Sequence, residues 1–178
     1  MNNAMSREER EGHEGRSLNQ HPSNLNEEEI GRIILDSAFK VHTTLGPGLL
    51  ESVYESALAM ELSRHGLDVE RQKPIPVRYA GHLLEVAFHA DLVVNKLVLV
   101  ELKSVETITA LFKKTVTNYL KLIPLRLGFL INFNEVHLKN GIVRVANGLE
   151  GKAFFNQPNI SEIDFQRPLI PSRSSRDI

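Results

Sequence analysis

The sequence predicts an α/β fold, a sandwich in which a mixed central sheet is flanked by helices. Two segments, residues 30–65 and 107–122, repeat apolar residues with the period of a helix. The segments between and after them have the shorter period of strands. The run LVLVELK is apolar on both faces, which is typical of a strand inside a covered sheet. The predicted order is helix, helix, three strands, helix and strand, which suits one domain.

The first two helices follow each other closely. Asn26 is a favourable N-cap and Glu29 its capping-box partner, so we expect a helix from there to near Leu45. The second helix is expected to begin at Pro47, which suits a first helical turn, and to end near His65, before a glycine.

Three strands are expected next. Residues 68–79 are predicted to be extended, and two prolines restrict this strand to an edge or an irregular position. A turn at Ala80-Gly81 leads to a strand over 82–94. A short loop around Asn95-Lys96 then leads to a buried strand over 97–103.

The remaining elements are a third helix and a further strand. The helix is predicted over 107–122, closed by Pro124, and the strand in LRLGFLINF. The segment HLKNGIVRV predicts a hairpin that turns at Asn140-Gly141. The residues expected to face inward from the helix are Ile108, Leu111, Phe112, Val116, Tyr119 and Leu120.

Composition limits the domain organisation and the location. Residues 1–24 are polar and unpatterned and are predicted to be a disordered leader, 25–168 a single domain, and 169–178 a tail. No apolar run approaches the length of a membrane span, and the N-terminus lacks the apolar core of a signal peptide. With no cysteine, disulfides, zinc ribbons and thiol nucleophiles are excluded, and a cytoplasmic protein is expected.

The charge distribution matters more than the total. A formal net charge of −1 does not indicate a globally basic nucleic-acid binder. Residues 102–134, however, contain five basic side chains and one acidic one. Lys113 and Lys114 in this segment could contact phosphates, although consecutive lysines are also typical of a solvated helix face.

The stretch ADLVVNKLVLVELKS contains the main candidate site residues. Glu101 and Lys103 share a face of their strand because side chains alternate with period two. Asp91 joins them only if the connecting loop is odd: a three-residue loop, 95–97, places 91 opposite 101, whereas a two-residue turn places it opposite 100. We predict the odd loop or an equivalent bulge.

Two neighbouring carboxylates in an apolar run need a compensating charge. Like charges directly opposite destabilise a sheet, and buried carboxylates are costly unless they are paired or bind a metal. Mg²⁺ (or Mn²⁺) would satisfy both, since it is held by one or two carboxylates together with waters and substrate phosphates. The alternative is that Asp91 merely ends a strand while Glu101 and Lys103 form an ordinary salt bridge.

The spacing D-x9-E-x-K, between two strands and before a helix, resembles that of the PD-(D/E)XK nuclease superfamily. The opening GPGLLESVY, with Gly48, Glu51 and Tyr54, resembles the signature of the bacterial GxxExxY protein family within it. Further likenesses lie in ADLVV, LVLVELKSVE, YLKL and LGFLINF, over roughly residues 27–147. The resemblance implies a restriction-endonuclease-like core, in agreement with the predicted order of elements.

The resemblance also implies roles for individual residues. Asp91 and Glu101 would ligate the metal, Glu51 would add a carboxylate from the second helix, and Lys103 would be the catalytic lysine. Glu51 is therefore expected to face the acidic cluster and not the solvent. Tyr54 is expected one turn behind it as a support.

Three further positions carry more specific expectations. The Tyr54 hydroxyl is expected to hydrogen-bond a carboxylate, and Gly48 to permit a close approach of the backbone near the site. Related sequences often place a glutamine four residues before the tyrosine of the third helix. Here Tyr119 is present, but Thr115 occupies the glutamine position, which puts substrate positioning in question.

The sequence thus favours a metal-dependent nuclease that hydrolyses nucleic acid, DNA more than RNA. Two alternatives stay open. One is a weakly active or inactive module that binds nucleic acid or protein on the nuclease fold, which Thr115 would favour. The other is an enzyme that acts on a different phosphate-containing substrate.

Overall fold

A computed structural model describes residues 24–148 of the chain. The leader expected over 1–24 lies outside this range except for its last residue, and so do the expected tail and the end of the expected domain. The boundaries predicted for the domain therefore stay predictions.

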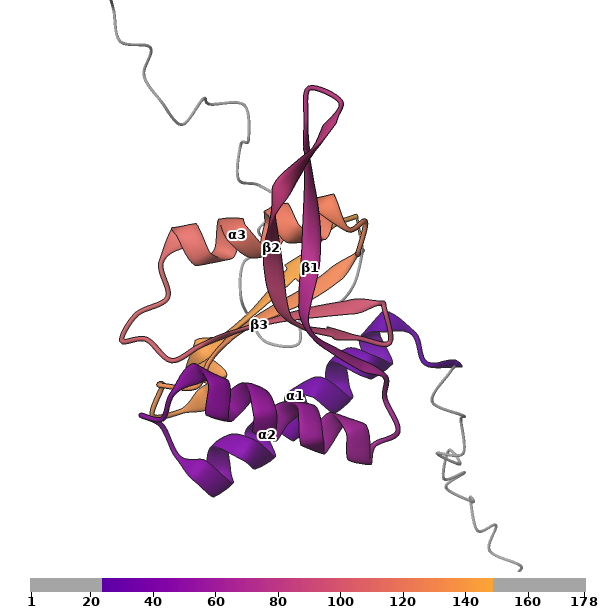
Figure 1. Cartoon of the computed structure of the whole chain (residues 1–178). Helices are drawn as coiled ribbons and strands as arrows, with labels where there is room; N and C mark the ends of the chain where they lie inside the picture. Colours follow the sequence, from indigo (N-terminus) through magenta and orange to yellow (C-terminus); the bar gives the residue numbers. More distant parts are fainter. Residues whose placement is uncertain (1–23, 149–178) are drawn as a thin grey trace, which may run out of the picture.

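The centre of the fold is a mixed five-stranded sheet (Figure 1). Its strands span Val69–Tyr79 (β1), His82–Val94 (β2), Val98–Lys103 (β3), Leu127–Asn132 (β4) and Ile142–Ala146 (β5). They lie in the order β1-β2-β3-β4-β5. β3 and β4 are parallel, and the other neighbouring pairs are antiparallel. The predicted mixed sheet is confirmed.

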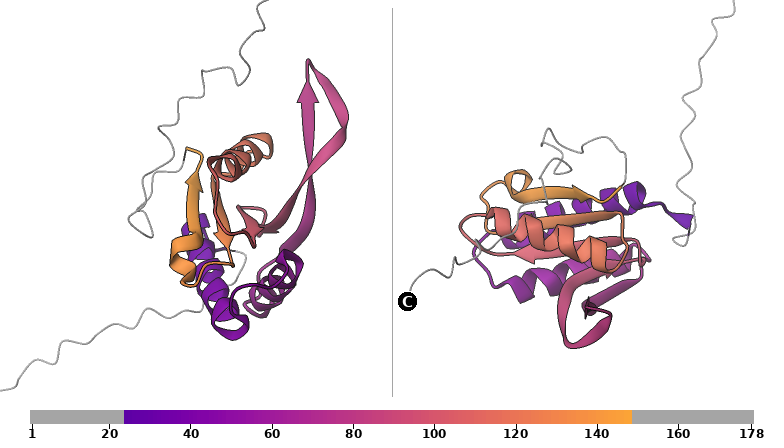
Figure 2. Two further views of the ribbon diagram at one scale, coloured as in Figure 1. Left: turned by 90° about the vertical axis from the view of Figure 1, so that its left-hand side faces the viewer. Right: turned by 90° about the horizontal axis from the view of Figure 1, so that it is seen from above.

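Helices cover both faces of the sheet (Figure 2). In the described range the α-helices span Glu27–Leu45 (α1), Glu51–Arg64 (α2) and Ala110–Leu122 (α3). α1 and α2 share an apolar core with one face, and α3 forms a second core with the other. None of the helices among residues 24–148 is both long and apolar enough to cross a membrane.

Side chains alternate along β3 between these two cores. Val100 and Leu102 belong to the core shared with α1 and α2, whereas Leu99 belongs to the core shared with α3. The period of two then places Glu101 and Lys103 on the α3 face. A strand that is apolar on both faces thus lies in the middle of the sheet, as its sequence predicts.

Two predictions, the N-terminal cap of α1 and the edge position of the proline-containing strand, are both confirmed. The Asn26 side chain accepts hydrogen bonds from the N–H groups of Glu28 and Glu29 at 3.0 Å, and the Glu29 carboxylate accepts from the Asn26 N–H at 2.9 Å. This is the predicted capping box. β1, which carries both prolines of its region, is an edge strand, and with β2 it projects as a long hairpin beyond the body of the fold (Figure 1).

The starts of α2 and α3 were predicted too early. α2 begins at Glu51 and not at Pro47, because Gly46 and Gly48 have φ angles of +70° and +92°, which a right-handed helix does not allow. α3 begins three residues after its predicted start.

Leu111, predicted to face inward from α3, is 70% exposed. It lies about 140° around the helix from Val116, at 3.6 residues per turn, and so falls outside the buried stripe.

The predicted hairpin turn at Asn140-Gly141 is wrong. Residues Leu138–Gly141 form a short 3₁₀ helix, and β5 pairs with β4. A Cβ atom on Gly141 would lie 2.5 Å from the carbonyl oxygen of Asn132. The glycine therefore permits a close approach to the end of β4 and does not form a turn with positive φ.

Asn132, at the end of β4, holds the connection between β3 and α3. It is fully buried, and its side-chain oxygen accepts from the N–H groups of Val105 at 3.0 Å and Asn134 at 3.3 Å. Its side-chain nitrogen donates to the Val105 carbonyl at 2.8 Å. The segment that follows Lys103 is thereby fixed against the sheet.

We expect Asn132→Ala to lower the free energy of unfolding by about 2–3 kcal/mol, because it leaves both backbone groups of Val105 without these partners. Asn118→Ala, at an exposed position of α3, is the control and should change it by less than about 0.5 kcal/mol. Urea unfolding measures both. Equal effects of the two substitutions would contradict this role of Asn132.

Candidate functional site

The site lies where β2 and β3 diverge. Their ladder pairs Val94 with Val98, Val93 with Leu99, and Leu92 with Val100, and it ends there. The connecting loop is therefore 95–97, the predicted odd loop, and the register places residue 91 opposite residue 101. Beyond this point the β1–β2 hairpin turns away from β3 (Figure 1).

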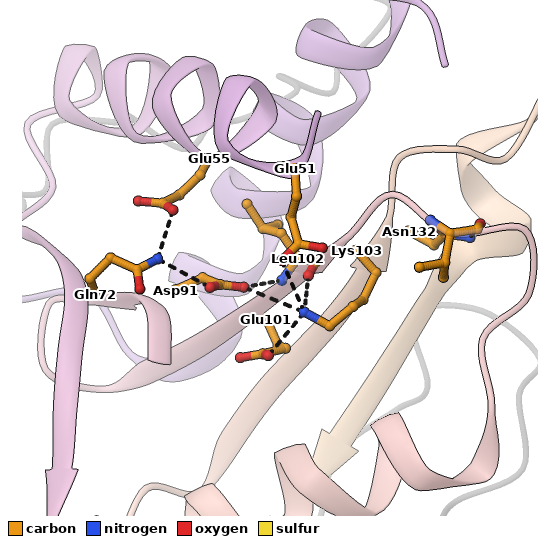
Figure 3. Close-up of polar contacts among 9 residues, drawn as sticks. Glu51, Glu55, Gln72, Asp91, Glu101, Leu102, Lys103 and Asn132 are labelled. Carbon is orange, nitrogen blue, oxygen red and sulfur yellow. Dashed lines mark hydrogen bonds and ion pairs between the residues drawn. The ribbon is translucent and has the colours of Figure 1, made fainter. Parts of the chain in front are cut away.

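Asp91 occupies the fork between the two strands. Its Oδ2 accepts a hydrogen bond from the backbone N–H of Leu102 at 2.8 Å, a group that has no ladder partner in β2. Its Oδ1 accepts from the side-chain nitrogen of Gln72 at 3.2 Å (Figure 3). Asp91 is 8% exposed, so the fork buries a carboxylate that is held at both oxygens.

The ammonium group of Lys103 lies among three carboxylates (Figure 3). Its Nζ is 3.1 Å from Glu101 Oε1, 3.2 Å from Glu51 Oε1 and 3.9 Å from Asp91 Oδ2. It also donates to the Leu102 carbonyl and lies 5.8 Å from the centre of the Phe112 ring. The structure thus brings together the four residues that the sequence predicts for the site.

Glu101 is the least satisfied member of this group. Its Oε2 is buried and has no hydrogen-bond partner in the described part of the chain. Burial, with a smaller contribution from the Asp91 charge, raises the pKa of Glu101 to about 7, although Lys103 acts in the opposite direction. A buried carboxylate with a free oxygen is a suitable ligand for a hard cation.

The same charges act on the neighbouring groups. Burial lowers the pKa of Lys103, but Glu101, Asp91 and Glu51 together outweigh it, so the net pKa lies above its usual value. Burial and then the charges of Glu101 and Asp91 also raise the pKa of Tyr119. Lys103 is therefore a protonated cation in this state, and the Tyr119 side chain is close enough to respond to the acidic cluster.

Glu51 lies at the start of α2, and its side chain is 41% exposed. It points toward Lys103 (Figure 3), in agreement with the expected inward orientation. Its exposed fraction shows that it also stays in contact with solvent. The position suits a carboxylate, because the N-terminal end of a helix stabilises negative charge.

Tyr54 holds the loop that precedes Glu51. Its hydroxyl donates to the Gly46 carbonyl at 2.6 Å and accepts from the Leu49 N–H at 3.1 Å. Its ring stacks on Phe133, with 4.5 Å between the ring centres. The expectation that this hydroxyl bonds a carboxylate is wrong: Tyr54 supports Glu51 through the loop.

The expected role of Gly48 is also wrong. A Cβ atom added there would have no neighbour within 4 Å, so close approach is not the reason for glycine. The reason is its φ of +92°, which other residues rarely adopt. Leu49, the next residue, accepts a hydrogen bond from Ser104 Oγ at 2.6 Å, which joins the loop to the segment after β3.

Thr115, one of the residues predicted on α3, has its described hydrogen bond within that helix and not with the acidic cluster. The Thr115 hydroxyl donates to the Leu111 carbonyl of its own helix at 3.1 Å. Lys113 and Lys114 are partly buried on the same helix. Nucleic-acid contacts by these lysines stay a prediction.

The site contains residues that the sequence reasoning missed. Gln72 links Asp91 to Glu55, a buried carboxylate of α2, and the Leu102 carbonyl adds an oxygen near Lys103. Glu55 follows Glu51 by one helical turn, a spacing that could have drawn attention to it. No pattern in the sequence identifies Gln72.

The donor set fits a divalent ion with one qualification. Among residues 24–148, no three acidic or histidine side chains already form a metal-binding group. The carboxylates are instead directed at Lys103. Asp91 and Glu101 nevertheless suffice for Mg²⁺, which keeps several waters, and the unpartnered Oε2 of Glu101 supports such a site.

Comparison with protein families agrees with this geometry. The model of the PD-(D/E)XK nuclease superfamily matches residues 28–145. The chain belongs to the PD-(D/E)XK nuclease superfamily. The match covers the fold from α1 to β5, and the structure has the mixed sheet and flanking helices of that fold. Searches of curated proteins and of solved structures gave no match.

Membership in the PD-(D/E)XK superfamily indicates a nuclease-type function, and nucleases of this superfamily generally use divalent metal ions. It does not distinguish the GxxExxY family, which stays a prediction.

We expect Tyr54→Phe to lower the free energy of unfolding by about 1–3 kcal/mol, because it keeps the buried ring but leaves the Gly46 carbonyl and the Leu49 N–H without their partner. Hydrogen exchange at the Leu49 amide should accelerate. Tyr79→Phe, at a residue 73% exposed, is the control. Unchanged exchange at Leu49 would show that the hydroxyl does not hold this loop.

We expect Glu101→Gln to stabilise the protein at pH 8 in the presence of EDTA. The folded-state pKa of Glu101 is about 7, against 4.5 for an ordinary glutamate, so the unfolded chain loses this proton first as pH rises. The free energy of unfolding therefore falls as the pH rises from 4.5 to about 7. The fall is about 3 kcal/mol at most, at 1.36 kcal/mol per pKa unit.

Glutamine lacks this titration, so Glu101→Gln should gain about 1–3 kcal/mol at pH 8 and little at pH 5. Urea unfolding at both pH values measures the difference. A variant that is less stable than the parent at pH 8 would contradict the stated cause of the raised pKa.

Proposed function

We propose that the protein is a metal-dependent nuclease that hydrolyses phosphodiester bonds of nucleic acid. The observation that carries this proposal is the fork between β2 and β3, where Asp91 and the unpartnered Glu101 carboxylate lie beside Lys103. Three carboxylates share one ammonium group, so the cluster has a negative excess that a divalent cation would neutralise.

Asp91 and Glu101 would hold the ion, Mg²⁺ or Mn²⁺, with Glu51 as a further carboxylate. Such an ion, when bound, polarises a phosphoryl oxygen and lowers the pKa of a coordinated water. Glu51 is the natural third contributor because its exposed side chain is free to turn without unpacking the core. The Leu102 carbonyl, which accepts a hydrogen bond from Lys103, is a further oxygen beside these carboxylates.

Lys103 would act on the scissile phosphate. Its raised pKa keeps it protonated, which favours a role in orienting the attacking water and stabilising the developing negative charge. In the present arrangement the same ammonium group keeps the carboxylates together.

We propose nucleic acid as the substrate, on the basis of the superfamily and of the local excess of lysine, and within nucleic acids we propose DNA in preference to RNA. Residues 102–134, which carry five basic side chains and one acidic one, include α3 beside the site. Lys113 and Lys114 are the proposed phosphate contacts on that helix. Both DNA and RNA belong in the assay.

A second candidate is a binding module on the nuclease fold, with weak or no turnover. The observation that favours it is the Thr115 hydroxyl, which bonds its own helix and offers no amide at the position where related sequences often have glutamine. This candidate predicts binding of nucleic acid or protein without metal-dependent cleavage.

We expect purified protein to bind Mn²⁺ in a calorimetric titration and to cleave DNA with Mg²⁺ or Mn²⁺. Asp91→Asn and Glu101→Gln should weaken binding by at least about tenfold, because each removes a charged ligand. Lys103→Ala should slow cleavage by about 100-fold or more while it retains metal binding, because it removes charge stabilisation.

Glu70→Gln is the matched control, since Glu70 pairs with Lys73 on the hairpin. It should leave both metal binding and cleavage unchanged. Cleavage that persists at the parental rate in Glu101→Gln and Lys103→Ala would overturn the nuclease assignment, and binding of DNA without any cleavage would establish the second candidate.

A further inference from the structure

Gln72 has an unusual backbone conformation for a residue inside a strand. Its φ is +47°, in the left-handed region that residues other than glycine seldom adopt. Among the described residues, the other non-glycine residues with positive φ are Ala80, Asn95 and Lys96, which lie in turns. Such strain persists only where the surroundings hold it, and it concentrates at functional sites.

A register change does not account for this conformation. On one side Arg71 is opposite Leu92, and on the other Lys73 is opposite Ala90. The register is the same on both sides of residue 72, so Gln72 is not an inserted bulge residue, and its position in the strand is opposite Asp91 although the two are not paired in the ladder. The strained backbone therefore serves to direct its side chain.

The side chain of Gln72 joins two carboxylates (Figure 3). Its Nε2 lies 2.7 Å from Glu55 Oε2 and 3.2 Å from Asp91 Oδ1. Carboxylates only accept hydrogen bonds, so the NH₂ group must face both and can give one hydrogen to each. The geometry thus also determines the orientation of the amide.

Glu55 provides the anchor for this amide. It is 6% exposed, and its Oε1 accepts from Arg71 Nε at 2.7 Å, which compensates its charge. Its Oε2 is then directed to Gln72. One turn of α2 separates Glu55 from Glu51, so the same helix approaches Lys103 directly and Asp91 through Gln72.

The consequence falls on Asp91. With Oδ1 bonded to Gln72 and Oδ2 bonded to the Leu102 N–H, its carboxylate is fixed in both position and plane. Loss of the Gln72 amide would free one side and allow the carboxylate to rotate away from Leu102.

We propose that Gln72 is a positioning residue for Asp91, held in a strained conformation so that its amide spans Glu55 and Asp91. The effect on metal binding rests on the proposed function, whereas the effect on the orientation of Asp91 does not. Gln72 is an exposed residue, so replacing it leaves no cavity in the core.

The test uses Gln72→Gly and Gln72→Asn in the full chain. Glycine adopts the left-handed conformation without strain but has no amide. Asparagine tolerates that conformation and keeps an amide, but it is one methylene too short to span both carboxylates. Lys73→Gln is the control, since Lys73 is the next residue and pairs with Glu70.

The first readout is hydrogen exchange at the Leu102 amide in metal-free protein. Both Gln72 variants should raise the exchange rate of the Leu102 amide about tenfold above that of the parent, after correction for any change in global unfolding. The reason is that Asp91 no longer holds this N–H firmly. Gln72→Gly should not lower the urea midpoint, since it also relieves strain. Unchanged exchange at Leu102 in both variants would overturn the proposal.

The second readout is the calorimetric affinity for Mn²⁺, which both variants should lower by about 10-fold or more while Lys73→Gln leaves it unchanged. If the parent binds Mn²⁺ and the variants bind equally well, the positioning role is refuted and the metal site stands. If the parent binds no Mn²⁺ but Leu102 exchange still responds, the positioning role stands and the proposed function fails.

Discussion

The contact of Lys103 with three carboxylates is the interaction on which the site depends. Asp91, Glu101 and Glu51 come from β2, β3 and α2, and nothing in their local structure would bring like charges together. One ammonium group does not balance three carboxylates, and burial, together with the Asp91 charge, raises the pKa of Glu101 although Lys103 lies beside it. Stability alone would favour an apolar residue in place of Glu101, because a buried charge is costly. Its presence is understandable if the imbalance serves to bind a cation.

The fork between β2 and β3 makes such a cluster possible. In a continuous ladder the Leu102 N–H would bond a carbonyl of the neighbouring strand, and Asp91 would lie against Glu101 with no donor. Because the β1–β2 hairpin turns away, the N–H is left for the Asp91 carboxylate. The parallel pairing with β4 keeps β3 in place on its other side, and Asn132 fixes the segment that follows. The divergence therefore leaves the Leu102 N–H hydrogen-bonded, to the Asp91 carboxylate in place of a carbonyl of β2.

The sequence predicted the order of elements and the central part of the site for clear physical reasons. Period-two alternation placed Glu101 and Lys103 on one face, whereas Asp91 joined them only through the choice of an odd loop, which the register confirms. Helix starts were less predictable, because the positive φ angles of Gly46 and Gly48 are a property of the folded loop, where a sequence pattern shows only glycine and proline. Contacts of Gln72 and Asn132 were not predictable at all. Each joins segments that are distant in the chain, and an isolated polar residue in a strand has no periodic signal.

The residues of the stretch GPGLLESVY have different roles in the structure, although they form one sequence motif. Its glycine, glutamate and tyrosine suggest three contributions to chemistry, yet only Glu51 contacts the charged cluster. Gly48 permits the turn of the loop, and the Tyr54 hydroxyl ties both ends of that turn while its ring is stacked on Phe133. Two of the three residues thus determine where α2 begins and hence where Glu51 lies. A glutamate on a partly exposed first turn is otherwise free to face water, so the precision of the site at this point depends on the loop and not on the carboxylate itself.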